Sequence, residues 1–226
     1  MITKEEYLAR GRAEDDWAPG WLAIDEAFAR LYPGVTPPHL GADLAARAMF
    51  GGSEYIDGYS LFPSPHGYQH LVTYGMSTLY VDEESYGGEF SGWGYEMTMK
   101  VAGTDPDDCR WAVDSLSRLG RYTYTSKRWF EPDQFISGRG EPLRVGSETL
   151  LTSYLIVPDT EVPGIDTVHG RVDFLQLVGI TQAELDWVAG ESPDGAVERV
   201  RDLVGRMRDG GDGLLVTDLA RRHSYV

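Results

Sequence analysis

The segment His169–Leu185 (HGRVDFLQLVGITQAEL) restricts the possible folds more than any other part of the chain, because a nearly continuous apolar run leads directly into a helix start. Between Val172 and Ile180, apolar residues occupy both sets of alternating positions, which predicts a strand buried on both faces. Thr181 precedes Glu184 by three residues. This is the spacing of a capping box, in which each side chain accepts a hydrogen bond from the other residue's backbone N–H. The chain should therefore contain a central strand that passes into a helix at Thr181.

The other elements follow from local periodicity and turn residues, and the strands and helices are interspersed without regular alternation. Gly92–Val101 is a clear strand, because aromatic and methionine side chains alternate there with glycine and polar ones. The pattern favours an α+β fold, with a mixed β-sheet flanked by helices in a single domain. Further strands are expected at Tyr59–Phe62, His70–Val81, Leu150–Val157 and Leu214–Thr217, helices at Trp21–Leu31, Pro106–Tyr122 and Ala196–Met207, and irregular segments at Ser126–Gly146 and Pro158–Gly164.

The composition limits the kinds of partner that this chain can bind. Its 226 residues are 42% hydrophobic, which suits one domain over residues 1–226, and 36 acidic against 20 basic residues give a net charge of −16. This charge repels nucleic acids and anionic membranes, and it would attract a basic protein. No apolar run is long enough to span a bilayer, and the charged N-terminus, MITKEEYLAR, lacks the apolar core of a secretory signal. We therefore expect a cytoplasmic protein with no membrane or nucleic-acid partner.

The residues that could carry out catalysis or bind metal form no recognisable constellation. Cys109, the single cysteine, falls on the apolar side of a predicted helix, which indicates a buried structural thiol. His66 and His70 have the H-x3-H spacing of zinc ligands on a helix, but they fall in a loop and a strand, so His70 is expected to have a structural role. The chain has no nucleophile elbow, P-loop or dinucleotide-binding motif. We expect no cofactor, no metal and no enzyme activity.

Glu96 is the carboxylate that most needs an explanation, because it interrupts an otherwise apolar strand. A buried carboxylate requires hydrogen-bond donors or a cation. We favour a satisfied carboxylate that orders the sheet, with Tyr74 or Arg171 as its partner. The alternative is general acid/base chemistry in a hydrolase or metal enzyme.

Several segments together resemble the Suppressor of fused family. GWLAIDEAFARLYP is similar to the family's opening helix, and SGWGYEMTMK matches its Ser-Gly-aromatic-Gly-aromatic-Glu-x-Thr signature. VDFLQLVGITQAEL matches the family's Phe-Leu-Gln-x-Val-Gly strand and the helix that follows it. GGSEYIDGYSLF, HLVTYGMSTLY and LLVTDLARR resemble three further family segments, and all six run in family order from about Gly20 to Arg222.

The resemblance implies a protein-binding module and not an enzyme. Two-domain animal members of the family restrain Gli-type transcription factors by clamping an extended peptide between this kind of domain and a second one. We expect that second domain to be absent here, so that the Gli-like role does not carry over. Stand-alone bacterial members resemble immunity proteins, which bind and neutralise a cognate toxin. A basic toxin domain is therefore the expected partner, and a regulatory adaptor that sequesters another protein through an extended peptide is the alternative.

The resemblance also indicates a binding surface, either by strand addition or by docking on the sheet and its loops. Tyr80 and Phe90 fall where the family has peptide-facing aromatic residues, although both could instead be core or loop anchors. The strand Phe174–Val178 borders that region in the family, and three acidic residues after Tyr80 could supply negative charge. The predicted partner-binding residues are Tyr80, Asp82, Glu83, Glu84, Phe90, Phe174, Gln176 and Val178.

Overall fold

The computed structural model describes residues 2–41, 56–190 and 194–226. The beginning of the GGSEYIDGYSLF segment lies outside these ranges, so this segment is described only from Ile56 onward. Across the described ranges, no helix combines the length and the apolar character needed to cross a bilayer.

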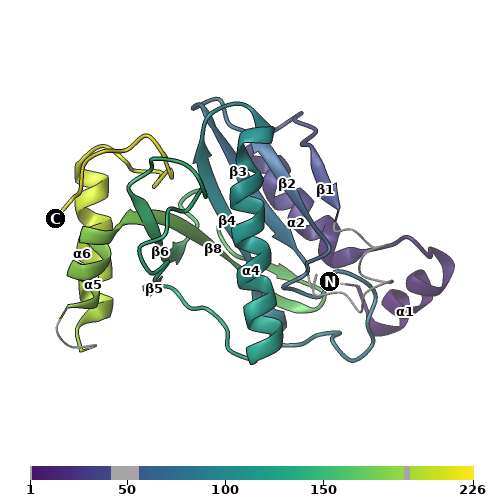
Figure 1. Ribbon diagram of the computed structural model, residues 1–226. Coiled ribbons are helices and arrows are strands. Elements are labelled where there is room, and N and C mark those ends of the chain that lie inside the picture. Colours follow the sequence, from purple (N-terminus) through teal and green to yellow (C-terminus); the bar gives the residue numbers. More distant parts are fainter. Residues whose placement is uncertain (1, 42–55, 191–193) are drawn as a thin grey trace.

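One mixed sheet of eight strands forms the centre of the molecule, in the order β1–β2–β3–β4–β8–β6–β5, with β7 paired to β8 outside this path (Figure 1). β4 and β8 are central and parallel, whereas the other pairs of described strands are antiparallel. With helices on both faces of this sheet, the structure confirms the predicted α+β fold. The strands are β1 (His39–Gly41), β2 (Gly58–Pro63), β3 (Tyr68–Tyr74), β4 (Phe90–Ala102), β5 (Gln134–Ile136), β6 (Leu151–Pro158), β7 (Ile165–Thr167) and β8 (Gly170–Thr181).

One face of the sheet is covered by α4 (Arg110–Ser126), which follows the short 3-10 helix η1 (Pro106–Cys109) (Figure 1). Alternate side chains of β4 and β8 pack there against Ala112 and Leu116. Cys109 is buried in the same core, and burial raises the pKa of its thiol to about 12. The thiol is therefore structural, as its position in the sequence predicts.

The opposite face is covered by α2 (Pro19–Leu31), which lies behind the sheet in Figure 1. Phe28 of this helix stacks on Phe62 of β2 at a centroid distance of 5.0 Å, and it meets Phe174 of β8 edge-on at 5.5 Å. Side chains on the two faces of β8 thus belong to two different cores, since its neighbour Leu175 points into the core beneath α4.

The remaining helices lie at the two ends of the molecule. α5 (Gln182–Ala189) and α6 (Ala196–Asp209) pack against β6 and the end of β8, where Val178 and Ile180 are buried. α1 (Lys4–Ala13) lies at the other end of the molecule (Figure 1). The sheet therefore has a separate apolar core at its α5–α6 end, in addition to those beneath α2 and α4.

The passage from β8 into α5 forms as the sequence predicts. The backbone N–H of Glu184 donates to Thr181 Oγ1 at 3.2 Å, and that of Thr181 donates to Glu184 Oε2 at 2.7 Å. The same carboxylate also accepts two hydrogen bonds from Arg221, at 2.6 and 2.8 Å. The capping box is thus confirmed, and its Glu184 additionally binds the C-terminal segment.

β3 is shorter than predicted. The strand expected over His70–Val81 ends at Tyr74, because the chain turns at Gly75 and wraps its backbone around the carboxylate of Glu96. Residues after this turn run along the beginning of β4, without joining the sheet as part of β3. The buried Glu96 carboxylate thus ends β3 at Tyr74, although the sequence pattern predicts a longer strand.

Two further predicted segments differ in the structure. The strand expected at Leu214–Thr217 is reduced to a single bridge between Thr217 and Val101, because Leu215 has a φ of +55°, which interrupts an extended backbone. The segment 126–146, expected to be irregular, contains β5, which pairs with β6 at the end of the sheet. A three-residue strand gives too short a pattern for periodicity to detect.

Candidate functional site

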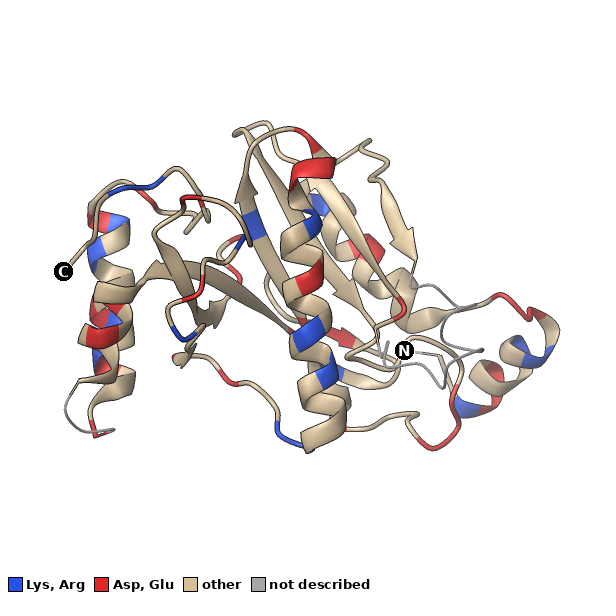
Figure 2. Ribbon diagram, viewed as in Figure 1, with Lys and Arg blue, Asp and Glu red and all other residues tan. Residues whose placement is uncertain are grey.

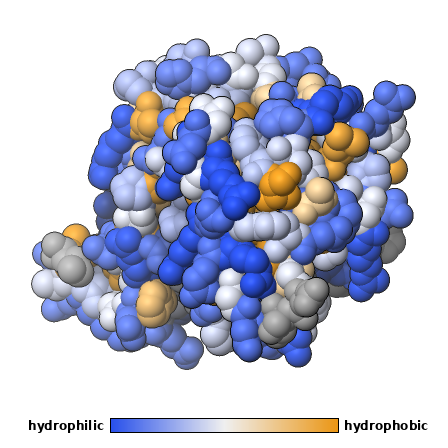
Figure 3. Space-filling view, turned by 90° about the vertical axis from the view of Figure 1, so that its left-hand side faces the viewer, coloured by the Kyte–Doolittle hydropathy of each residue, from blue (hydrophilic) through white to orange (hydrophobic). Residues whose placement is uncertain are grey.

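A groove of about 520 Å³ opens where the first parts of β4 and β8 meet the segment 129–132, and we call it the aromatic groove. Its floor includes Leu175, which belongs to the core beneath α4. The face over α5 and α6 is different, since hydrophilic side chains predominate there and apolar ones are scattered (Figure 3). The walls of the aromatic groove include Phe90, Trp93, Trp129, Phe130, Glu131 and Asp173.

A bulge in β4 creates this groove. Phe90 is paired with Arg171 of β8, but Tyr95 is already paired with Asp173, so several extra residues of β4 lie between two nearby pairs. Such bulges bend a strand and redirect its side chains. The bulge explains the Ser-Gly-Trp-Gly part of the sequence signature.

The two glycines of the bulge are required by their conformations and by close approaches. Gly92 and Gly94 have φ angles of +56° and +83°, which residues with a side chain rarely adopt. A Cβ atom on Gly92 would lie 2.7 Å from the carbonyl oxygen of Met76, and one on Gly94 would lie 3.2 Å from the Phe90 ring. The glycines therefore allow the strand to pass the 76–78 segment and leave space for the Phe90 ring.

The aromatic walls of the groove differ in how firmly they are held. Phe90 is 55% exposed and Trp129 is 56% exposed. Trp93 is held more firmly, because it packs edge-on against Tyr124 at 5.7 Å and has Lys127 Nζ 5.8 Å from its ring centre. The two most exposed rings thus offer apolar surface to another molecule.

Two carboxylates complete the groove. Trp129 Nε1 donates to Glu131 Oε1 at 3.3 Å, which places this carboxylate beside the exposed ring. Asp173 Oδ1 accepts a hydrogen bond of 2.9 Å from Arg171 Nε, so part of its charge is already compensated. The groove therefore has apolar walls with negative charge at its rim.

Tyr80 and Phe90, two residues predicted to bind a partner, are both exposed and belong to neighbouring segments. Tyr80 exposes 54% of its surface. The segments 76–78 and 91–93 run side by side, with the N–H of Trp93 donating to the Met76 carbonyl at 2.9 Å. The structure therefore places the segment that leads to Tyr80 beside the one that carries Phe90.

Two of the three acidic residues that follow Tyr80 have partners within the chain. The Asp82 carboxylate accepts hydrogen bonds from Ser85 Oγ at 2.5 Å and from the Glu84 N–H at 3.1 Å, and these bonds lower its pKa. Glu83 forms an ion pair of 3.3 Å with Lys4 of α1, and Glu84 is exposed. The contacts of Asp82 and Glu83 therefore organise a turn and its junction with α1.

The three predicted residues of β8 lie in the interior. Phe174 packs beneath α2, and Val178 packs beneath α5 and α6. Gln176 is fully buried, and its amide group donates to the backbone carbonyls of Leu214 and Leu215 at 3.0 and 2.9 Å. These side chains hold the sheet together, and a partner could not reach them without opening it.

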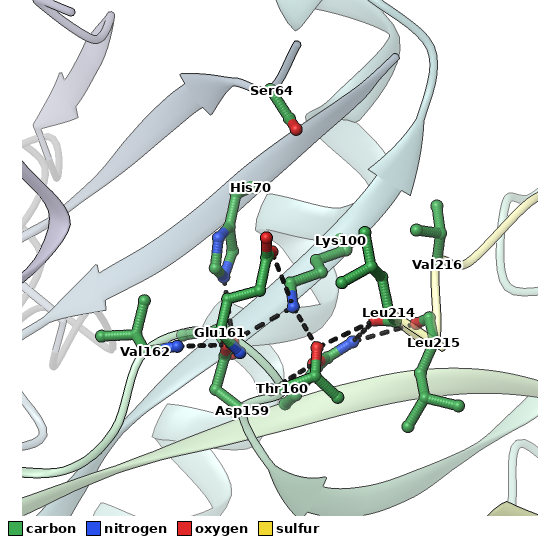
Figure 4. A network of polar contacts seen from close by, with 12 residues as sticks. Ser64, His70, Lys100, Asp159, Thr160, Glu161, Val162, Leu214, Leu215 and Val216 are labelled. Carbon is green, nitrogen blue, oxygen red and sulfur yellow. Dashed lines mark hydrogen bonds and ion pairs between the residues drawn. The ribbon is translucent and has the colours of Figure 1, made fainter. Parts of the chain in front are cut away.

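A second group of polar residues lies inside the protein. His70 of β3, Lys100 of β4, and Asp159 and Glu161 of the loop after β6 form a buried ion cluster (Figure 4). Asp159 lies 2.9 Å from His70 Nε2 and 3.5 Å from Lys100 Nζ, and Glu161 lies 3.0 Å from the same ammonium. The side chains of His70, Lys100 and Asp159 have no exposed surface. The cluster attaches the loop that begins at Asp159 to β3 and β4, although the sequence predicts this loop to be irregular.

Asp159 accepts further hydrogen bonds, from the Thr98 hydroxyl at 2.6 Å and from the backbone N–H groups of Glu161 and Val162 at 2.8 and 3.0 Å. Burial alone would raise the pKa of Asp159, but the hydrogen bond and charge of His70, together with Lys100, hold it well below its usual range. The carboxylate is therefore ionised in the folded protein and fully occupied by its own chain.

Glu96 is also buried and satisfied. Its carboxylate accepts hydrogen bonds from the hydroxyls of Thr73 and Ser77, both at 2.6 Å, and from the N–H groups of Gly75, Met76 and Ser77. Burial raises its pKa, against the opposing effect of these donors. Glu96 is a satisfied, buried carboxylate, as predicted. The predicted partners are wrong, because Tyr74 donates to Asp25 and Arg171 pairs with Asp173.

Sequence reasoning missed Trp129 and Phe130 as wall residues of the groove. They stand in a segment without periodicity, and the signal that could have found them is an aromatic pair within an otherwise polar stretch. His70, considered as a metal ligand, belongs to the ion cluster. In the described part of the chain, no group of three or more histidine, cysteine or acidic residues is arranged to hold a metal ion.

Comparison with known sequences agrees with the resemblance described above. The sequence model of the Suppressor of fused protein (SUFU) family matches residues 52–222. The human and mouse Suppressor of fused homologues are each 28% identical to this chain over 217 residues, covering 89% of it and 43% of the relative. The chain thus spans less than half the length of these two relatives.

Comparison with solved structures shows the same fold. A chain from the Sufu–Fu complex superimposes with a TM-score of 0.75 at 24% identity, covering 92% of this chain and 93% of that one. Drosophila Suppressor of Fused gives a TM-score of 0.75 at 26% identity, with coverage of 92% and 51%. A SUFU homologue from Neisseria gonorrhoeae gives 0.61 at 16% identity, with coverage of 92% and 97%.

Proposed function

This chain belongs to the Suppressor of fused family, whose domain is a protein-interaction domain, and we propose that it is an immunity protein that binds and neutralises a cognate toxin. In this proposal the chain performs no catalysis and acts by stoichiometric occlusion of its partner. The proposed contact surface is centred on the aromatic groove and extends toward Tyr80.

The observation that carries this proposal is the exposure of large aromatic side chains around one concave site. Phe90 and Trp129 both line a groove of about 520 Å³, and each is more than half exposed. Aromatic residues contribute disproportionately to the binding energy of protein interfaces, especially where they occupy pockets. A soluble domain gains no stability from leaving such rings in water, so a bound protein is the expected reason for their exposure.

The net charge of −16 supports a basic partner, such as a nuclease toxin. Acidic residues are spread over several elements of the fold (Figure 2). Such a field accelerates the association of an oppositely charged protein, and salt weakens the effect. Association rates that do not change between low and high ionic strength would therefore contradict electrostatic capture.

The polar residues of the sheet support a non-catalytic role. Glu96 and Asp159 are the carboxylates that a buried active site would use, and the hydrogen bonds of both are directed to the protein itself. A general base must be within reach of a substrate proton. In this proposal both carboxylates are structural.

The test begins with affinity capture from the native host, using the tagged wild-type chain and the double variant Phe90→Ser, Trp129→Ser in parallel. Val197→Ser is the matched control, because Val197 is an exposed apolar residue on α6, away from the groove. The proposal predicts one partner that is retained by the wild type and the control and lost from the double variant. That partner should arrest growth when expressed alone, and equimolar expression of this chain should restore growth.

A regulatory adaptor is the second candidate function, because one structural neighbour was solved as a Sufu–Fu complex. In this alternative the chain sequesters a non-toxic protein through an extended peptide. A captured partner that leaves growth unaffected and binds through a short linear segment would favour the adaptor over the immunity protein.

A further inference from the structure

We propose that the aromatic groove takes the side chain of an arginine or lysine from an extended segment of the partner. This inference rests on the proposed function and adds the chemistry of the residue that is recognised. The groove offers apolar walls for an aliphatic stem and negative charge for a cationic head, which is the combination that long basic side chains require.

The charges in the groove favour a cation. Its lining contains two carboxylates, Glu131 and Asp173, and the basic side chains next to it, Lys127 and Arg171, are already engaged with Trp93 and Asp173. Arg171 already binds Asp173 at 2.9 Å, so Glu131 is the carboxylate better placed to meet a charge from outside. Glu131 is exposed and lies beside Trp129, whose indole N–H points to it at 3.3 Å.

The aromatic rings suit the same ligand. A cation within about 6 Å of an aromatic ring centre is attracted to the ring's negative face, most strongly by tryptophan. The chain already shows such a contact, because Lys127 Nζ lies 5.8 Å from the centre of the Trp93 ring. Trp129 and Phe90 offer two further, more exposed rings in the same groove. A cation that contacts the Trp129 ring would also be close to Glu131, because the indole N–H donates to this carboxylate.

The groove also has a suitable size. Its volume of about 520 Å³ falls within the range of pockets that enclose small ligands, and it exceeds what one side chain needs. Residues on either side of the basic one could therefore contact other apolar residues of the lining, such as Phe130 and Pro132.

The experiment uses the full chain labelled with nitrogen-15 and follows its tryptophan indole N–H signals during titration with N-acetyl-arginine methylamide. N-acetyl-citrulline methylamide is the matched probe, because it has nearly the same shape and no charge. The Trp129 signal is assigned from its absence in Trp129→Phe. Trp187 serves as an internal reference, since it lies on α5 and outside the groove.

We expect the arginine probe to shift the Trp129 signal saturably, with an affinity at least about tenfold higher than that of the citrulline probe. Glu131→Gln should weaken arginine binding several-fold, and Asp173→Asn should weaken it less, because Arg171 already compensates Asp173. Equal affinity for both probes, unchanged binding in Glu131→Gln, or an equal shift of Trp187 would overturn the inference.

The two proposals fail separately. If the arginine probe does not bind but the captured partner is lost from the Phe90→Ser, Trp129→Ser variant, the groove binds a protein through some other side chain, and only the inference about charge is wrong. If the probe binds as expected but no partner is neutralised, the recognition chemistry stands and the immunity function is wrong.

Discussion

The buried ion cluster and the aromatic groove reverse the usual placement of polar and apolar side chains. The side chains of Lys100 and Asp159 have no exposed surface, whereas Phe90 and Trp129 are more than half exposed. The charged groups are hydrogen-bonded within the chain, so the cluster contributes to the fold. The two aromatic rings leave much of their apolar surface open to another molecule. Mutations in the two regions should therefore affect different properties. Those in the cluster should change stability, and those in the groove should change partner binding.

The largest expected effect on stability comes from Lys100→Met. The change leaves Asp159 and Glu161 without their shared ammonium inside the protein, which should lower the free energy of unfolding by about 3–5 kcal/mol. Urea denaturation measures this loss, and Arg30→Met is the control, because the Arg30–Glu26 pair is largely exposed and should contribute less than about 1 kcal/mol. Similar losses in the two variants would contradict the distinction between buried and exposed charges.

Acid should reduce the stability that the ion cluster contributes. Because the pKa of Asp159 is lowered in the folded protein, its contribution is fully present above the unfolded pKa of about 3.9 and is lost as the pH falls through the folded pKa. Unfolding measured from pH 7 downward should therefore show stability decreasing at acidic pH. Glu184, whose pKa is also lowered, contributes with the same sign. The part due to Asp159 is the part of the slope that disappears in Asp159→Asn, and an identical slope in that variant would contradict it.

Gly94→Ala should affect both stability and binding, to an intermediate degree. Its φ of +83° makes a side chain costly by about 1–2 kcal/mol, and the new Cβ would lie 3.2 Å from the Phe90 ring. Gly67→Ala is a closely matched control, because Gly67 has the same φ and no atom within 4 Å of the added Cβ. Thermal unfolding should show similar losses for both variants, and only Gly94→Ala should weaken partner binding. Equal partner affinity in both variants would contradict a role of Phe90 in the binding surface.

The smallest effect on stability is expected for Phe90→Ser combined with Trp129→Ser. Because both rings are largely in water, the free energy of unfolding should change by no more than about 1 kcal/mol for the pair. Partner affinity, measured by titration calorimetry, should fall by at least about 30-fold, as for interface residues that dominate binding. Strong destabilisation with unchanged affinity would show that these rings support the fold and do not form the contact surface.

The sequence predicts best what short segments determine by themselves. Thr181 and Glu184 are three residues apart, so their capping box is visible without any tertiary information. The burial of β8 on both faces is likewise apparent from its apolar run. The ion cluster could not be predicted in this way, because His70, Lys100 and Asp159 come from three distant segments that meet only in the folded sheet.

The candidate site could be predicted only in part. Phe90 and Tyr80 follow from the family resemblance and are exposed in the structure. Trp129 lies in a segment with no periodicity, and it reaches the groove only because the chain passes from α4 along the start of β4 on its way to β5. Phe174 is predicted at the site but lies in the core beneath α2. A strand that borders a binding region also carries side chains that point into the interior.

The parallel pairing of β4 with β8 has a consequence for synthesis on the ribosome. β4 cannot gain its central neighbour until the whole segment between Ala102 and Gly170 has been translated, which takes several seconds at about 5–20 residues per second. Until then, β4 leaves the backbone groups along this edge unpaired, and pairing between such distant strands is slow. Protein yield should therefore depend on chaperones that shield this edge. Slower elongation after Gly170 should raise the yield little, because β8 is then already being synthesised.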